Sequence, residues 1–263
     1  MEGEKLTLGP ATATRVNLDD TTKVYHLPQW RGMSDPARLK TLREIALPAG
    51  RDPRIATLAV QLLKANNVKP REHRKAAEAL LKFVQTRIFY VNEPGERLQD
   101  PVYTLRVGYG DCDDMAMVLA ALCESLRLPW RFVISGRRGN RIVRWVEGTP
   151  YREAQWSHIY LAIGDRPFAP KKWWFAEPTL KKPLGWDVVV ASKGGTVPLP
   201  ELAGVGADDD GDDDKEKLTV RGVIGDVKKS LTPRRIVVGL IVGFITGLVT
   251  RPLVNAYFRH RRR

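Results

Sequence analysis

The chain has 263 residues, of which 43% are hydrophobic and 28% are charged, a balance typical of a globular protein rather than a disordered one. Its formal net charge of +13 would suit either an anionic membrane surface or a nucleic acid. We do not expect nucleic acid as a partner, because the basic residues form no stripe with interleaved aromatic residues. The only cysteines are Cys112 and Cys123, which excludes a disulfide-rich framework and fits a reducing compartment.

The N-terminal third predicts helices after an irregular start. The first residues have no basic flank followed by an apolar core, so we expect no secretory signal and a domain that folds in the cytoplasm. Residues 1–36 are expected to form an N-terminal arm, and residues 36–45 a short helix. In "DPRIATLAVQLLKANN", Asp52 is a candidate N-cap and Pro53 suits the first helical position. The run "REHRKAAEALLKFVQTRIFYV" repeats the helical spacing of apolar residues.

Runs rich in β-branched and aromatic residues follow the two cysteines and predict strands. They are separated by turns that contain glycine and proline, and they read "WRFVISG", "RIVRWVEG", "HIYLAIG", "WWFAEPT" and "WDVVVAS". Helices first and strands later are typical of an α+β domain. We assign residues 37–203 to this domain.

The C-terminal part differs sharply in composition. Residues 204–217 contain "GADDDGDDDKEK", which we expect to be a solvated acidic linker because its spacing does not fit a Ca²⁺-binding loop. Residues 218–263 contain a basic-flanked apolar stretch at 236–258. At about 1.5 Å per residue this stretch is long enough to span a bilayer core of about 30 Å. We therefore expect a C-terminal membrane helix that anchors the chain, and a helix packed within a soluble assembly is the alternative.

Two further features of this stretch bear on partners. Glycines recur every four residues and predict a smooth helix face for self-association, at Gly239, Gly243 and Gly247. Both flanks are basic, so the charges leave the membrane orientation open.

The stretch "GYGDCDDMAMVLAALCESLRLPW" places Cys112 at the start of an unusually apolar helix. The nine residues from Met115 to Cys123 are all apolar, which predicts a helix at the centre of the domain. Unpaired N–H groups and the helix dipole favour a thiolate at the N-terminus. The charges of Asp111 and Asp113, candidate capping residues, oppose it, so a reactive Cys112 requires a cationic partner.

Cys123 is expected to be an inert core residue. It follows Cys112 by about three helical turns, roughly 16 Å along the axis, which is too far for a disulfide. The spacing does not suit a metal pair either. We expect no metal and no cofactor.

Among the four histidines, His158 is the candidate base for Cys112. It opens the strand-like run "HIYLAI", whereas the others lie in less suitable surroundings: His26 in the irregular arm, His73 in a solvated turn and His260 in the terminal basic cluster. Glu177 lies on the next expected strand, so antiparallel pairing would bring it beside His158 to fix the imidazole tautomer. Asp165 is a poorer candidate because it belongs to a turn.

The motifs "GYGDCDDMAMVLAAL", "WSHIYLAI" and "WFAEPT", in this order, resemble the transglutaminase-like superfamily, which has a papain-like cysteine-proteinase fold. The resemblance implies a central buried helix packed on an antiparallel sheet, with Cys112 as nucleophile, His158 as general base and acid, and Glu177 as the orienting carboxylate. The family usually has aspartate where this chain has Glu177. The longer side chain changes the geometry that is required of the acid.

The resemblance also implies acyl transfer through a thioester, on a protein or peptide substrate that offers a peptide bond or a glutamine amide. Compact bacterial and phage members are commonly peptidase-like, so we expect hydrolysis, by a peptidase or amidase, rather than transglutaminase-type cross-linking. A side-chain donor to the oxyanion stays open among Gln99, Tyr103 and Tyr109. The alternative is a non-catalytic membrane or virion assembly protein on the same scaffold.

Overall fold

The helix α5, Cys112–Ser125, lies at the centre of the fold, which the computed structural model describes over residues 4–8, 10–19, 22–92 and 97–192. Every residue from Met115 to Cys123 is buried, because a helix that is apolar on all sides has no face for water. Four further helices contact α5: α1 (Asp35–Gly50), α2 (Pro53–Ala65), α3 (His73–Arg87) and α4 (Pro101–Val107).

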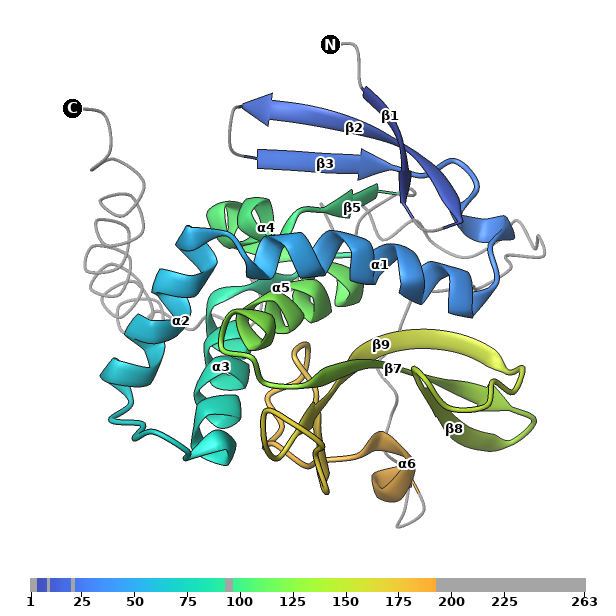
Figure 1. The fold of residues 1–263 in the computed structure, drawn as a ribbon. Coiled ribbons are helices and arrows are strands. Elements are labelled where there is room, and N and C mark those ends of the chain that lie inside the picture. The colour runs from blue at the N-terminus through green and yellow to red at the C-terminus, as the bar shows by residue number, and fades with distance from the viewer. Residues whose placement is uncertain (1–3, 9, 20–21, 93–96, 193–263) are drawn as a thin grey trace, which may run out of the picture. The chain divides into compact units, whose positions relative to one another are not determined.

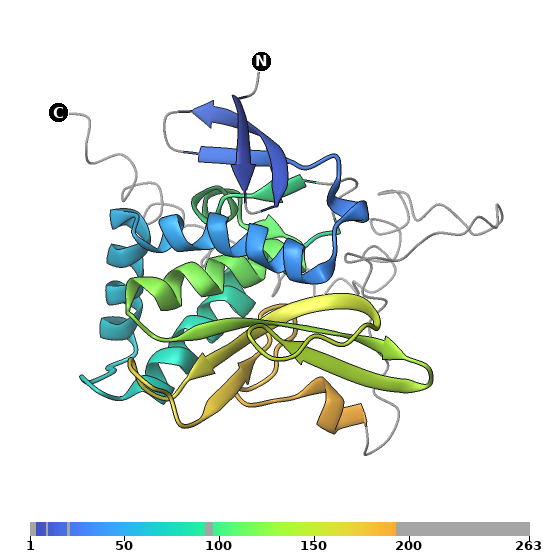
Figure 2. The ribbon, with the colours of Figure 1, turned by 45° about the vertical axis from the view of Figure 1, so that its right-hand side comes forward.

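The sheet that carries the predicted histidine packs against α5. It consists of β7 (Trp130–Arg138), β8 (Arg141–Val146), β9 (Gln155–Gly164) and β10 (Trp173–Ala176). The strand order is β10-β9-β7-β8, and every pairing is antiparallel. Figures 1 and 2 show α5 between α1 and this sheet. The predicted α+β class, with a buried helix on an antiparallel sheet, is confirmed.

A second antiparallel sheet occupies the region that was expected to be an irregular arm. It has the order β1-β2-β3-β5, formed by β1 (Glu4–Leu8), β2 (Ala11–Asp19), β3 (Thr22–His26) and β5 (Arg97–Gln99). That expectation was wrong. The buried positions of β2 include Ala11 and Ala13, whose small side chains give almost no alternation of hydrophobicity in the sequence. A 3-10 turn, Trp30–Gly32, leads from this sheet to α1.

The predicted helices are present, but their boundaries differ from the predicted ones. The predicted cap of α2 is confirmed, since Asp52 accepts a hydrogen bond from the amide of Arg54. The first predicted helix is longer than expected. In contrast, α3 ends at Arg87, and the next residues form β4 (Phe89–Tyr90), which pairs in parallel with β6 (Tyr109–Gly110). This pairing brings a strand from far upstream directly beside the start of α5.

The last predicted strand, "WDVVVAS", was wrong. Its valines form the short helix α6, Val188–Ala191. Asp187 caps this turn by accepting a hydrogen bond from the amide of Val189. A local cap therefore outweighs the preference of β-branched residues for strands.

The predictions for the C-terminal part lie outside the described residues. Within the ranges that the structure describes, no helix combines the length and the apolar character needed to cross a membrane. The segment 236–258, its three glycines and the acidic linker fall beyond these ranges. The membrane anchor and self-association therefore stay predictions.

Candidate active site

The N-terminus of α5 is held by reciprocal capping. Asp111 Oδ1 accepts hydrogen bonds from the amides of Asp113 at 3.0 Å and Asp114 at 3.3 Å, while the Asp114 carboxylate accepts from the Asp111 amide. Asp114 is completely buried, and its other oxygen accepts from the amide of Gln99. Gly110 allows this packing, since a Cβ atom there would lie 2.6 Å from Cβ of Asp114. The capping box fixes Cys112 as the first residue of the helix.

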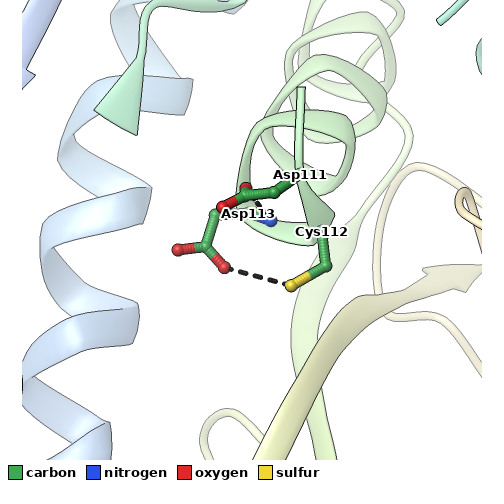
Figure 3. A group of neighbouring side chains, drawn as sticks. All are labelled: Asp111, Cys112 and Asp113. Atoms are coloured by element: carbon green, nitrogen blue, oxygen red, sulfur yellow. Dashed lines mark hydrogen bonds between the residues drawn. The ribbon is translucent and has the colours of Figure 1, made fainter. Parts of the chain in front are cut away.

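The thiol of Cys112 is enclosed by protein and only 1% exposed. Its sulfur donates to Oδ1 of Asp113 at 3.5 Å, as Figure 3 shows. Burial raises the pKa of Cys112 well above that of an ordinary thiol, the charges of Asp113 and Asp111 raise it further, and a hydrogen bond from the Ile159 amide lowers it. The helix terminus was expected to favour a thiolate, but burial and the two carboxylates outweigh it. Cys112 is therefore a neutral thiol here.

His158 and Glu177 form a buried pair. Nε2 of His158 lies 2.6 Å from Oε2 of Glu177, and each side chain is 1–2% exposed. Burial alone would raise the pKa of Glu177, but His158 and the hydrogen bonds from Thr179 bring it below its ordinary value. A carboxylate can only accept, so Nε2 carries the proton that it shares with Glu177. The structure brings these two predicted residues together, and the predicted antiparallel pairing of their strands, β9 and β10, is observed.

The other imidazole nitrogen faces no hydrogen-bond partner. Nδ1 of His158 is buried and unpaired within the described part of the chain. With Nε2 protonated, a neutral imidazole has its free lone pair on Nδ1. The next residue along β9, Ile159, is the one whose amide contacts the Cys112 sulfur. Cys112 and His158 therefore lie on neighbouring elements, α5 and β9, which contact each other.

Glu177 is held by residues that the sequence analysis missed. Its Oε1 accepts from the amide of Thr179 at 3.0 Å and from the hydroxyl at 2.7 Å. Gln85, on α3, donates to the backbone carbonyls of Glu177, Leu180 and Lys182. Thr179 belongs to the "EPT" motif and could have been inferred from it. Gln85 could not, because it lies in α3, far from Glu177 in the sequence. These bonds fix the turn that follows β10.

Tyr90 is a further side chain near the site that the sequence analysis missed. Burial raises its pKa, and so do the charges of Asp111, Asp113 and Glu177. Its phenol is therefore a hydrogen-bond donor in an otherwise acidic neighbourhood. Because Tyr90 is 38% exposed, it lies at the boundary between the site and solvent. Its sequence signal was hidden because the expected helix ran through it.

The remaining candidates lie in several elements. Cys123 is completely buried, and burial raises its pKa. His26 pairs on β3, and His73 is the first residue of α3. Gln99 is also completely buried; its amide donates to Asp114 in the first turn of α5, and its side chain accepts from Thr104. Tyr103 lies in α4 and Tyr109 in β6.

Asp111, Cys112 and Asp113 offer ligand atoms within 4.8 Å of one another. These atoms are already engaged, since Asp111 caps α5 and Asp113 accepts from the thiol. Capping and hydrogen bonding account for this grouping without a cation.

The chain has matches among known protein families and solved structures. Residues 56–178 match the model of the transglutaminase-like superfamily, and no curated protein sequence matches the chain. A solved structure of a putative cysteine protease from Cytophaga hutchinsonii is 14% identical to this chain, with a TM-score of 0.31. The match covers 68% of this chain and 66% of that one, which is just under two thirds. The family match and the buried Cys112 support a cysteine-dependent enzyme. Residues 56–178 therefore form a transglutaminase-like domain.

Proposed function

We propose that this protein hydrolyses peptide or glutamine amides through a thioester on Cys112. The observation that carries the proposal is the arrangement of His158, whose Nε2 is fixed by Glu177 while Nδ1 has no partner. A lone pair held in this way accepts a proton from a nearby thiol. The amide of Ile159 places the sulfur of Cys112 beside the histidine-bearing strand.

Acylation starts from a neutral thiol and a neutral imidazole. As Sγ of Cys112 forms a bond to the amide carbon, the S–H proton moves to Nδ1 of His158 and the carbonyl π electrons move to oxygen. The C–N bond then breaks, and the leaving amine takes the proton from Nδ1. Glu177 stabilises the transient imidazolium through Nε2. A thioester and a free amine result.

Deacylation reverses the roles. Water attacks the thioester carbon as its proton moves to Nδ1, and the C–S bond breaks as sulfur takes that proton back. Carboxylic acid leaves and the neutral pair is restored. The oxyanion in both steps is stabilised by the Cys112 amide at the helix start and by the phenol of Tyr90.

The burial of all three side chains strengthens these interactions. Charges and hydrogen bonds act in a low dielectric when water is excluded, which raises their effect on the transition state. The same burial means that a substrate reaches Cys112 only after a local displacement at its boundary with solvent, where Tyr90 lies. We therefore expect slow reaction with reagents that do not resemble an amide substrate.

The test uses the full chain and a peptide in which an electrophilic ketone replaces the glutamine amide. We expect mass spectrometry to find the adduct on Cys112. His158→Ala should slow labelling by about 10²-fold or more, while the control Cys123→Ala should label like the wild type. Unchanged labelling in His158→Ala, or equal adducts on Cys123, would contradict the proposal and favour a non-catalytic scaffold.

Product analysis separates hydrolysis from cross-linking. Glutamine peptides incubated with and without a primary amine yield glutamate by hydrolysis, or an amide of the added amine by transfer. We expect glutamate, or a cleaved peptide bond, in both conditions. A dominant amine adduct would assign the enzyme to cross-linking.

A further inference from the structure

A hollow of about 520 Å³ runs along β8, on the opposite end of the sheet from β10. All six residues of the strand, Arg141–Val146, line it. Successive side chains of a strand point to opposite faces of a sheet. A hollow that touches all of them in sequence must therefore lie along the edge of the strand rather than over one face.

No described strand lies beside this edge. In the order β10-β9-β7-β8, the strand β8 pairs with β7 alone among the described strands. The edge of a sheet presents backbone N–H and C=O groups to whatever lies next to it. Val189 of α6 also lines the hollow, as do Thr149 and Pro150 of the turn that follows β8. The edge is thus set inside a groove.

The groove is strongly basic. Four arginines line it, against the single carboxylate of Glu153: Arg138, Arg141, Arg144 and Arg152. Arg144 pairs with Asp187, whereas Arg138, Arg141 and Arg152 are exposed. Exposed charges along a sheet edge often have no ligand, because they prevent the edge from pairing with other chains. That role needs no walls, so the flanking α6 and the 149–150 turn point to a ligand.

We propose that β8 binds an extended acidic peptide segment of a partner protein, which adds to the sheet as a further strand. The backbone edge supplies hydrogen bonds, and the arginines select acidic side chains along the added strand. Nucleic acid fits less well. The two tryptophans that line the groove, Trp145 and Trp156, are 8% and 4% exposed, so neither offers a face on which a base can stack.

This site is separate from the proposed chemistry at Cys112, so its test is a binding measurement. The full chain carrying Cys112→Ala is titrated with a short fluorescent peptide in which glutamate alternates with threonine. The comparison peptides replace glutamate by glutamine, or carry N-methyl groups on every second amide in either of the two phases. N-methylation removes the strand hydrogen bonds on one side of the peptide only.

We expect the glutamate peptide to bind and the glutamine peptide to bind at least about 10-fold more weakly. Only one N-methylation phase should abolish binding. The double variant Arg141→Glu, Arg152→Glu should lose about 10-fold or more in affinity, while the matched control Arg51→Glu, Arg127→Glu, at exposed positions outside the groove, should not. Thermal unfolding checks that each variant is folded.

Three results would overturn the proposal. They are equal effects of the two methylation phases, equal loss in the control variant, and tighter binding of single-stranded DNA than of the peptide at the same salt concentration. The first result would exclude strand addition, and the second would exclude this groove as the binding site. The third would indicate that the groove binds nucleic acid rather than a peptide.

Discussion

Oε2 of Glu177 lies 2.6 Å from Nε2 of His158, while the second oxygen of the same carboxylate takes both hydrogen bonds of Thr179. The family usually has aspartate at this position, and the longer glutamate still reaches the imidazole here. The two carboxylate oxygens contact two different partners, His158 and Thr179. Glutamate at position 177 is therefore placed where it can orient the imidazole, as the usual aspartate would.

Glu177→Gln should keep the fold but lower the rate of thioester formation by about 10²- to 10⁴-fold, because a neutral amide lacks the negative charge that stabilises an imidazolium. Glu177→Asp should retain part of the rate, since it keeps the charge and loses only reach. Single-turnover kinetics with a glutamine peptide measures both. Wild-type rates in Glu177→Gln would move the orienting role to another residue.

Alkylation of Cys112 by a small reagent should follow a pKa above the value of about 8.5 for an ordinary thiol. The reason is burial, followed by the charges of Asp113 and Asp111. Asp113→Asn removes one charge and one acceptor, so it should shift the pH profile toward lower pH. Alkylation rates between neutral and alkaline pH, with Cys123→Ala as background, give this profile. A midpoint at or below that of a free thiol in the wild type would contradict a neutral resting thiol.

The same raised pKa predicts a loss of stability at alkaline pH. Below about pH 8.5 the thiol is protonated in both the folded and the unfolded chain, so it contributes no pH dependence. As pH rises further, the unfolded chain ionises first, and the free energy of unfolding falls by up to about 1.4 kcal/mol per pH unit. The alkaline slope should be smaller in Cys112→Ala. Equal slopes in the two proteins would argue against the raised pKa.

Tyr90→Phe should lower the rate of acylation, by up to about 10²-fold, if the phenol donates to the oxyanion. Binding of the substrate should change little, because the ring remains. The loss should therefore appear in kcat more than in KM. Tyr109→Phe, at an exposed position on the neighbouring strand β6, is the matched control. Equal effects of the two substitutions would assign Tyr90 a packing role.

Residues within the three motifs could be predicted, whereas partners that reach the site from elements outside these motifs could not. The position of Cys112, the Asp111 cap and the burial of α5 follow from local spacing, and the pairing of His158 with Glu177 follows from two adjacent strands. Tyr90 and Gln85 reach the site from separate elements, one through a parallel pairing and the other through a helix packed across the turn. The first sheet was missed because Ala11 and Ala13 bury too little surface to mark their strands.

Residues 236–258 remain a predicted membrane helix. The full chain should sediment with membranes and resist a carbonate wash, whereas a chain ending at residue 203 should not. Arg251 is the awkward residue, and its position toward the C-terminal end lets its side chain reach the head groups. Recovery of the full chain in the soluble fraction would favour a helix packed within a protein assembly.

Gly136 should be the glycine on which the position of His158 depends most. It lies in β7 beside the irregularity at Ser135, whose partner on β9 is His158. A Cβ atom at Gly136 would lie 1.9 Å from the carbonyl oxygen of Gln155 and 2.6 Å from Cα of Trp156, so the backbone of β9 would have to move. Gly136→Ala should therefore destabilise the fold by about 1–3 kcal/mol and reduce the acylation rate beyond what the loss of folded protein explains.

Gly32→Ala is the matched control for this substitution, because a Cβ atom there has no neighbour within 4 Å and its φ is not positive. Thermal unfolding and single-turnover rates, normalised to the folded fraction, separate the effect on stability from the effect on the site. Gly32→Ala should leave both unchanged. If Gly136→Ala also kept the wild-type melting temperature and rate, β9 would have room to shift without moving His158, and the close approach of the two strands would not be what positions the base.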